Sequence, residues 1–374
     1  MQFTDKRKEY MHELRREELS TMFENRRRKI LKGISPSKGQ SGNNEYGSMG
    51  SENKQGILEE SLLQEDVSIV GLMQSLSFFK RCKDELKRVD SREFLSILVK
   101  IRERMSAYGD NVPVDDFIGS GLYQIISMIL DPHFVKSNPE HAREATWIMC
   151  NACMGTKIQL DIFINLGYVE VLQKLLSKGV GDVQTLDHII WGVCNMIGKS
   201  FEIRDYILDH PILSSFLELM RRKSMNIELE TRYAWLCCNL LNGPEYPPLN
   251  KINAFDEQAC SILLAFDGES LHTECISAIS CYLTPNDHKE ERISNILGSK
   301  VFRKLRTLFI QEKQSPLNIK ALLNIIGMLL LGTSDQVDMI LDTELISGLI
   351  QLTKSMYQKF AAEALWCLGV CMAS

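Results

Sequence analysis

Two residue types that can bind an extended peptide recur at a fixed interval in the middle of the chain. They are a Trp and, four residues later, an Asn. The three copies read Trp147-Ile-Met-Cys-Asn151, Trp191-Gly-Val-Cys-Asn195 and Trp235-Leu-Cys-Cys-Asn239, and the interval from Trp to Trp is 44 residues both times. Four residues is about one helical turn, so each Trp and its Asn share one face of a helix.

The chemistry of such a row of residues is binding rather than catalysis. Flat indole rings form slots that accept the aliphatic stem of a Lys or Arg and attract its cation. An Asn one turn away offers a donor and an acceptor, which can hold the N–H and C=O groups of a peptide backbone. Together these groups would bind a strand of basic residues without requiring it to fold.

An alternative is that each Trp is a core aromatic residue and each Asn a capping or buried polar residue. For a single copy that alternative would be favoured. Three copies in register favour the peptide groove instead, because Ile148, Val193, Leu236 and their neighbours already supply an apolar stripe for the core.

The elements that position these residues are repeated helices. A period of roughly 40 to 47 residues is typical of armadillo and HEAT solenoids, in which each unit packs only against its neighbours. The pattern predicts an all-α fold, a right-handed armadillo-repeat solenoid of about seven units over residues 64–374. The long third helix of each unit would line the groove. These helices are expected to end near Ala107, Gly155, Lys199, Asn242, Thr284, Gly332 and Ser374.

The N-terminal part of the chain has a different composition. Residues 1–33 predict a charged basic helix that ends at Gly33, and residues 34–63, rich in Gly, Ser, Asn and Gln, predict a flexible linker. Residues 1–32 carry ten Lys or Arg and six Asp or Glu, whereas the chain as a whole has a net charge of −5. A basic tail therefore precedes an acidic body.

The four consecutive cations Arg26, Arg27, Arg28 and Lys29 have two interpretations. They are either a charged helix end that binds polyanions nonspecifically, or a mimic of the groove's ligand that the linker holds at high local concentration.

Other functional classes have little support. The seven His residues are scattered without a nucleophile and base pattern, so we expect no enzyme, no catalytic residue, no cofactor and no metal site. Cys150-Asn-Ala-Cys153 is a lone CxxC inside a predicted helix and is interpreted as core. The longest apolar runs are too short to span a bilayer, and the basic residues gather in the tail, so neither membrane nor nucleic acid is an expected partner.

The sequence resembles the importin-alpha family of nuclear-import adaptors over most of its length. The segment from Glu144 to Thr156 resembles the family's recurring third helix, and Asn242-Gly-Pro-Glu-Tyr-Pro-Pro-Leu249 resembles its Pro-rich break after the fourth repeat. Met11 to Leu19, followed by Glu24 to Ile30, resembles the importin-beta-binding segment.

The resemblance implies a nuclear import adaptor that shuttles between cytoplasm and nucleus. Its partners would be importin-beta and cargo proteins that carry a basic nuclear localisation signal. The implied signal-binding residues are Trp147, Asn151, Trp191, Asn195, Trp235 and Asn239, with Asp187 and Glu274 at positions where acids suit the groove. The implied importin-beta-binding and autoinhibitory residues are Arg15, Arg16, Arg26, Arg27, Arg28 and Lys29.

Several positions depart from the family pattern. Lys199 stands where the family has an Asp that receives a lysine of the signal, and Arg232 and Leu160 replace a polar Asn and a Thr. Like charge at Lys199 is expected to weaken lysine binding. In the seventh unit Trp366 is kept but its Asn partner is Val370, so only the major site is expected.

These departures leave a second function open. The chain would then be a divergent armadillo scaffold that binds another peptide and has no transport activity. The family's ten repeats are reduced to about seven here, and the repeats that bind the export factor are expected to be missing.

Overall fold

The structure, a computed structural model, describes residues 91–107, 112–180, 182–224, 226–242, 246–284, 287–310, 315–341 and 343–372. The predicted basic helix over residues 1–33, with its six implied importin-beta-binding cations, and the predicted linker over residues 34–63 lie outside these ranges.

The described residues form helices and no strand, which confirms the all-α prediction for this part of the chain. They belong to two compact units, Met1–Gly155 and Thr156–Ser374. None of the described helices is long and apolar enough to cross a membrane.

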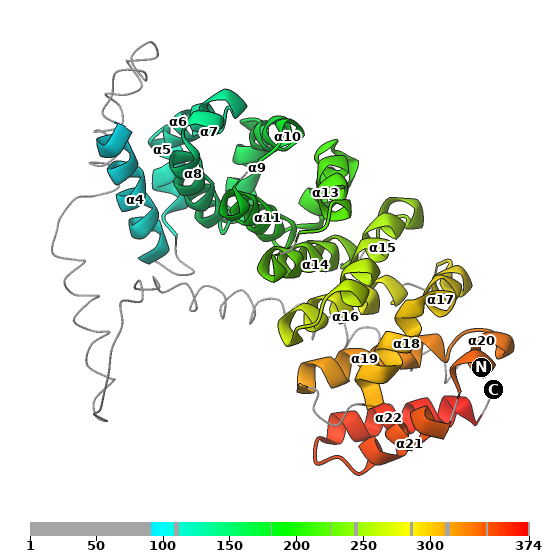
Figure 1. Cartoon of the computed structure of the whole chain (residues 1–374). Coiled ribbons are helices and arrows are strands. Elements are labelled where there is room, and N and C mark those ends of the chain that lie inside the picture. The colour runs from blue at the N-terminus through cyan, green and yellow to red at the C-terminus, as the bar shows by residue number, and fades with distance from the viewer. Residues whose placement is uncertain are drawn as a thin grey trace, which may run out of the picture. The chain divides into compact units, whose positions relative to one another are not determined.

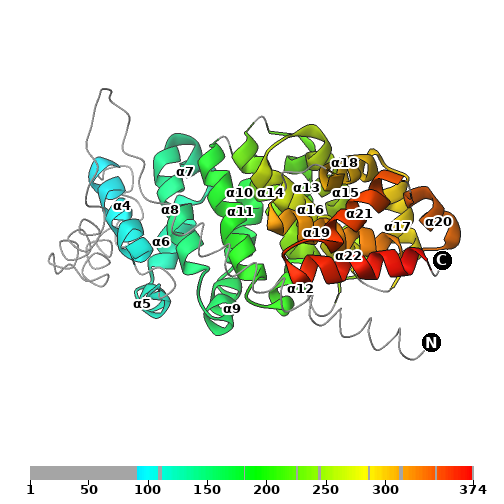
Figure 2. The ribbon, with the colours of Figure 1, turned by 90° about the horizontal axis from the view of Figure 1, so that it is seen from below.

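The first unit contains α4 and α8, which pack against each other, together with three shorter helices that surround α8 (Figure 2). The helices are α4 (Ser91–Ala107), α5 (Val114–Gly119), α6 (Leu122–Ile129), α7 (Pro132–Ser137) and α8 (Pro139–Ala152). Gly121, between α5 and α6, has a φ of 72°, a left-handed conformation that glycine adopts without strain. The same turn returns between the first two helices of the second unit at Gly167, with a φ of 81°.

The second unit is a stack of helices in layers (Figure 1). Each third helix packs on the next, in the order α11, α14, α16, α19 and α22, and the second helices α10, α13, α15, α18 and α21 form a parallel series. The helices are α9 (Lys157–Asn165), α10 (Tyr168–Lys178), α11 (Val183–Ile197), α12 (Phe201–Asp209), α13 (Ile212–Arg221), α14 (Ile227–Leu241), α15 (Leu249–Ala265), α16 (Glu269–Leu283), α17 (Lys289–Leu297), α18 (Lys300–Ile310), α19 (Pro316–Leu329), α20 (Ser334–Ile340), α21 (Thr343–Thr353) and α22 (Gln358–Cys371).

Three of the third helices begin with a residue whose side chain caps them. Asp182, Asn226 and Ser315 accept hydrogen bonds from the backbone N–H groups three residues later, at the beginnings of α11, α14 and α19. A side-chain oxygen at this position satisfies one of the N–H groups that a helix leaves unpaired. The caps at residues 182 and 226 are 44 residues apart, so the period of the Trp residues also governs where the helices begin.

Two buried arginines satisfy the opposite ends of third helices. Arg204 on α12 donates from Nη1 to the carbonyl of Asn242 at 2.8 Å, and Arg292 on α17 donates from Nη1 to the carbonyl of Tyr282 at 2.9 Å. The last carbonyls of a helix have no intrahelical donor and carry partial negative charge, so a cation stabilises them. Both arginines are 1% exposed or less, and these carbonyl contacts account for their burial.

The fifth unit differs from the predicted three-helix pattern. A single helix of 17 residues, α15, runs from Leu249 to Ala265 in place of a short first helix and a second helix. The sequence between these residues contains no Gly or Pro that would break it.

The interior of the second unit also holds a buried acid of unusual protonation. Asp256 on α15 is buried, and loss of hydration, helped by the nearby charge of Glu257, raises the pKa of its carboxyl to about 8. The ordinary value is 3.8. The folded protein therefore holds a proton here at pH values where the unfolded chain has released it.

Replacing Asp256 with Asn should flatten the dependence of stability on pH. In the native chain the contribution of Asp256 is fully present below its unfolded pKa and is lost as pH rises towards the folded pKa, by up to roughly 1.4 kcal/mol per pH unit. Urea unfolding between about pH 4 and pH 8 measures this. Asp338→Asn, at an exposed acid on α20, is the control and should keep the native slope. Parallel profiles for Asp256→Asn and the native chain would contradict the assignment.

Candidate peptide-binding surface

The three Trp and Asn pairs all lie on third helices. Trp147 and Asn151 are on α8 in the first unit, whereas the other two pairs are on α11 and α14 in the second unit. Since α11 and α14 pack against each other, the pairs at 191/195 and 235/239 belong to neighbouring helices of one stack.

The rings of the second unit are covered. Trp191 is 5% exposed and Trp235 is 2% exposed, although the sequence predicted rings that packing did not need. One of the groups that cover these two rings is a cation of the same chain. The guanidinium carbon of Arg232 lies 4.7 Å from the ring centroid of Trp191 and 5.3 Å from that of Trp235. These are the distances at which a cation is attracted by an aromatic face.

Asp187 holds this arginine in place. Nε of Arg232 donates to Oδ1 of Asp187 at 2.8 Å, and Nη2 donates to Oδ2 at 3.3 Å. The two bonds run in parallel, an arrangement in which the planar fork of Arg matches a carboxylate. The two side chains are 16% and 24% exposed, so the pair is only partly shielded from water. Arg232, Asp187 and the two rings therefore form one cluster between α11 and α14, which we call the cation slot.

The first unit has the same three groups, but here the arginine lies on the earlier of the two third helices and the acid lies on the later one. The guanidinium carbon of Arg102 on α4 lies 4.6 Å from the ring centroid of Trp147, and its Nε donates to Oε2 of Glu144 on α8 at 2.9 Å. In the cation slot the arginine stands three residues before a Trp, whereas here the acid Glu144 does so. Both units thus place an internal arginine, paired with an acid, over a repeated Trp.

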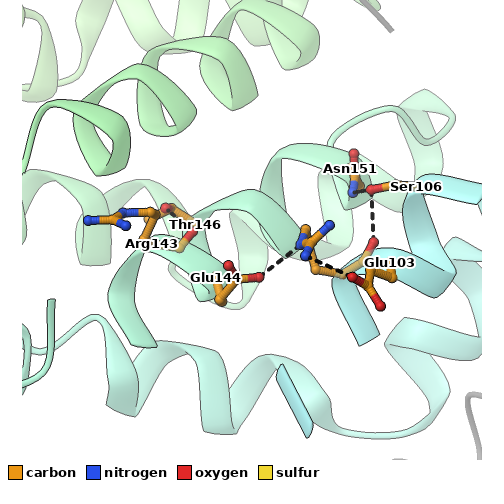
Figure 3. Close-up of polar contacts among 7 residues, drawn as sticks. Glu103, Ser106, Arg143, Glu144, Thr146 and Asn151 are labelled. Atoms are coloured by element: carbon orange, nitrogen blue, oxygen red, sulfur yellow. Dashed lines mark hydrogen bonds and ion pairs between the residues drawn. The ribbon is translucent and has the colours of Figure 1, made fainter. Parts of the chain in front are cut away.

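The asparagines are buried and make bonds within the chain. Nδ2 of Asn239 donates to the carbonyl of Trp235 at 2.8 Å, and Nδ2 of Asn151 donates to Oγ of Ser106 at 3.0 Å (Figure 3). Asn195 is 1% exposed. Each of these two bonds uses one of the two N–H groups of the amide, so Asn239 and Asn151 already spend one donor inside the chain.

The remaining predicted residues lie in different surroundings. Lys199 is exposed in the turn after α11, so its cation faces water. Glu274 is buried inside α16, at 5% exposure. In the seventh unit, Trp366 on α22 lies so close to Gly327 on α19 that a Cβ atom added there would be 2.6 Å from the ring. This ring packs on the backbone of its neighbouring helix.

Two members of the surface were not identified from the sequence, Arg102 and Glu144. The sequence feature that could have identified them is the number of residues between two opposite charges. Arg102 precedes Glu144 by 42 residues, and Asp187 precedes Arg232 by 45. A separation close to the repeat length brings two side chains to neighbouring third helices. A search for opposite charges at about one period would have found both pairs.

Within the described residues no group of three or more His, Cys, Asp or Glu is arranged to hold a metal ion. Cys150 and Cys153 are buried free thiols, as their interpretation as core residues expects. In the part of the chain that the structure describes, the groups available for binding are aromatic rings, amides, cations and acids.

Comparison with known proteins finds importin-alpha subunits among the proteins to which this chain is similar. The chain is 28% identical over 284 residues to importin subunit alpha-7 of Arabidopsis thaliana and 24% identical over 296 residues to importin subunit alpha-1b of Oryza sativa subsp. japonica. These matches cover 74% and 79% of this chain. The chain is similar to importin-alpha subunits. This finding confirms the predicted resemblance. The chain spans about half the length of these relatives, 51% and 53%. No protein-family model matches it.

Solved structures agree on the fold. A computationally designed armadillo repeat protein for modular peptide recognition has a TM-score of 0.56 at 16% identity, covering 66% of this chain and 98% of its own. A designed armadillo repeat protein in complex with the peptide (KR)4 has a TM-score of 0.54 at 18% identity, with the same two coverages. The predicted armadillo fold is therefore confirmed.

A double-mutant cycle on Arg232 and Asp187 should show that the pair is coupled. Asp187→Asn, Arg232→Gln and the double variant, compared by urea unfolding, are expected to give a coupling free energy of about 1 kcal/mol, because the pair is bidentate and partly buried. The exposed pair of Glu218 on α13 and Arg222, the residue directly after this helix, is the control and should give only about 0.3–0.5 kcal/mol. Equal coupling in the two cycles would show that stacking and burial add nothing.

Proposed function

We propose that the protein is a nuclear import adaptor of the importin-alpha type. It binds basic nuclear localisation signals of cargo proteins along its third helices and binds importin-beta through residues 1–33. The proposed signal-binding residues are Trp147, Asn151, Trp191, Asn195, Trp235, Asn239, Asp187 and Glu274. The proposed importin-beta-binding and autoinhibitory residues are Arg15, Arg16, Arg26, Arg27, Arg28 and Lys29.

The observation that carries this proposal is the cation slot. A guanidinium lies against two indole rings and is paired with a carboxylate, so these residues form a chemical environment that suits a cationic side chain. A basic signal presents side chains of the same kind on an extended backbone. The surface therefore has the chemistry that recognition of such a peptide needs.

The comparisons also support the proposal of a nuclear import adaptor. The relatives with which the chain shares most of its length are named as importin-alpha subunits, and one protein of similar fold binds the peptide (KR)4 of alternating Lys and Arg. The proposal also implies that the protein shuttles between cytoplasm and nucleus. None of these proteins is named as an enzyme.

A second function is favoured by specific observations. Arg232 already covers Trp191 and Trp235, and Lys199 adds a positive charge at the end of α11. Both cations oppose the binding of lysine-rich signals. The alternative is an armadillo scaffold that binds another peptide and does not take part in transport.

The proposal predicts that the intact chain binds a fluorescent octapeptide of alternating Lys and Arg, measured by anisotropy. An acidic scrambled peptide should not bind. Trp147→Ala should weaken binding about tenfold, because an aromatic face for a cation is lost. Phe201→Ala, at an exposed ring on α12, is the matched control and should leave affinity unchanged. A chain without residues 1–56, checked for native circular dichroism, should bind more tightly if the basic tail occupies the surface.

Binding of importin-beta separates the two functions. Titration of importin-beta against a peptide of residues 1–32 should give saturable binding that is lost when Arg26, Arg27, Arg28 and Lys29 are replaced with Ala. Basic-peptide binding without importin-beta binding would support the scaffold. Failure of every form of the chain to bind the basic peptide above the acidic one would reject the adaptor.

A further inference from the structure

We propose that Arg232 is a resident occupant of the cation slot, and that the slot consequently selects arginine over lysine in an incoming basic peptide. This inference rests on the proposed function, since it concerns which basic peptide the surface accepts. It adds a specificity-determining residue and a class of ligand to that function.

The slot has no vacant cation position in its present arrangement. Arg232 lies 4.7 Å and 5.3 Å from the two ring centroids, and both oxygens of Asp187 accept bonds from it. A cation from a peptide can reach the same rings and the same carboxylate only after the resident guanidinium leaves. Binding is therefore an exchange of one cation for another, and its free energy is the difference between them.

This exchange treats the two basic side chains differently. An incoming arginine is planar and can restore both the stacking and the paired bonds to Asp187 that Arg232 gives up. An incoming lysine is a compact point charge, which can restore attraction but neither the stacked plane nor the two parallel bonds. Displacement is thus nearly balanced for arginine and unfavourable for lysine.

The displaced arginine has a second carboxylate within reach along its own helix. Glu228 stands four residues before Arg232 on α14 and is exposed. An acid placed four residues before a base is the favourable order for a pair on a helix surface. Arg232 can therefore leave the slot by changing its rotamer, without unfolding any part of α14.

Lys199 does not explain such a preference. Its exposed cation in the turn after α11 repels arginine and lysine alike, so it lowers both affinities without separating them. The arrangement is also not confined to α14, because Arg102 and Glu144 cover Trp147 in the first unit in the same manner. Internal arginines over repeated tryptophans are a property of this chain.

The experiment compares two octapeptides, one of Arg and one of Lys, each with the same fluorophore, on the full-length protein. Native protein should bind the Arg peptide at least about tenfold more tightly than the Lys peptide. Only an incoming arginine can restore the stacking and the paired bonds to Asp187 that Arg232 gives up. Arg232→Asn should strengthen binding of both peptides, with the larger gain for the Lys peptide, so that the ratio falls to about threefold or less.

Arg222→Asn is the matched control. It removes the same charge at the exposed residue directly after α13 and should leave the ratio at its native value. Arg232→Lys is the second variant, which keeps the helix and the charge. It should also lower the ratio, because the resident then lacks the planar fork. Circular dichroism and thermal unfolding establish that each variant is folded.

The outcomes separate this inference from the function on which it rests. If native protein binds both peptides equally, or if Arg232→Asn and Arg232→Lys leave the ratio unchanged, the resident arginine does not select and the inference is rejected while peptide binding stands. If no variant binds either peptide above an acidic control, the proposed function is rejected as well.

Discussion

Direct packing of each third helix on the next is the constraint on which the second unit depends. In a stack of repeats no helix reaches a common core, so α14 has to pack against both α11 and α16. Side chains that are large, flat or charged have to be accommodated in these contacts. The caps at Asp182 and Asn226 keep successive third helices in register, and the buried Arg204 and Arg292 satisfy their far ends.

An ion pair that lies against an indole ring is one way to fill the contact between two third helices. An indole ring at a helix contact presents a face that attracts a cation, and a cation taken from water needs a nearby acid. Arg232 with Asp187, and Arg102 with Glu144, meet both needs. The same arrangement that stabilises neighbouring helices therefore covers the rings that were expected to bind a peptide. Packing and recognition compete for the same atoms.

The sequence predicted the helices better than it predicted the surface. The 44-residue interval fixed the positions of the third helices, and those of the described units end within a few residues of the expected positions. It also marked Asp187 as an acid and Arg232 as an added cation near the groove. It did not predict that the two pair across helices, because that depends on rotamers and on the closeness of α11 and α14. The single helix α15 was missed because the three-helix pattern of the other units was extended to a segment that contains no Gly or Pro to break it.

The exposure of the tryptophans could not be predicted from the sequence for the same reason. A Trp repeated in register is compatible with an open groove and with a buried contact, and periodicity alone does not distinguish them. The arginine that covers Trp191 lies on the neighbouring helix α14, three residues before Trp235, and it covers that ring as well. The opposite charges of Asp187 and Arg232, 45 residues apart, would have indicated the covered state of both rings.

The contact between Trp366 and Gly327 differs from the cation slot in its sensitivity to ionic strength. There an aromatic ring rests on the backbone of the neighbouring helix, so the two groups in contact are uncharged. Between α11 and α14 the contact includes an ion pair that is partly open to water. Dissolved salt screens an exposed ion pair and leaves contacts between apolar groups largely intact. Added salt therefore weakens the ion pair of Arg232 and Asp187 more than the contact between Trp366 and Gly327.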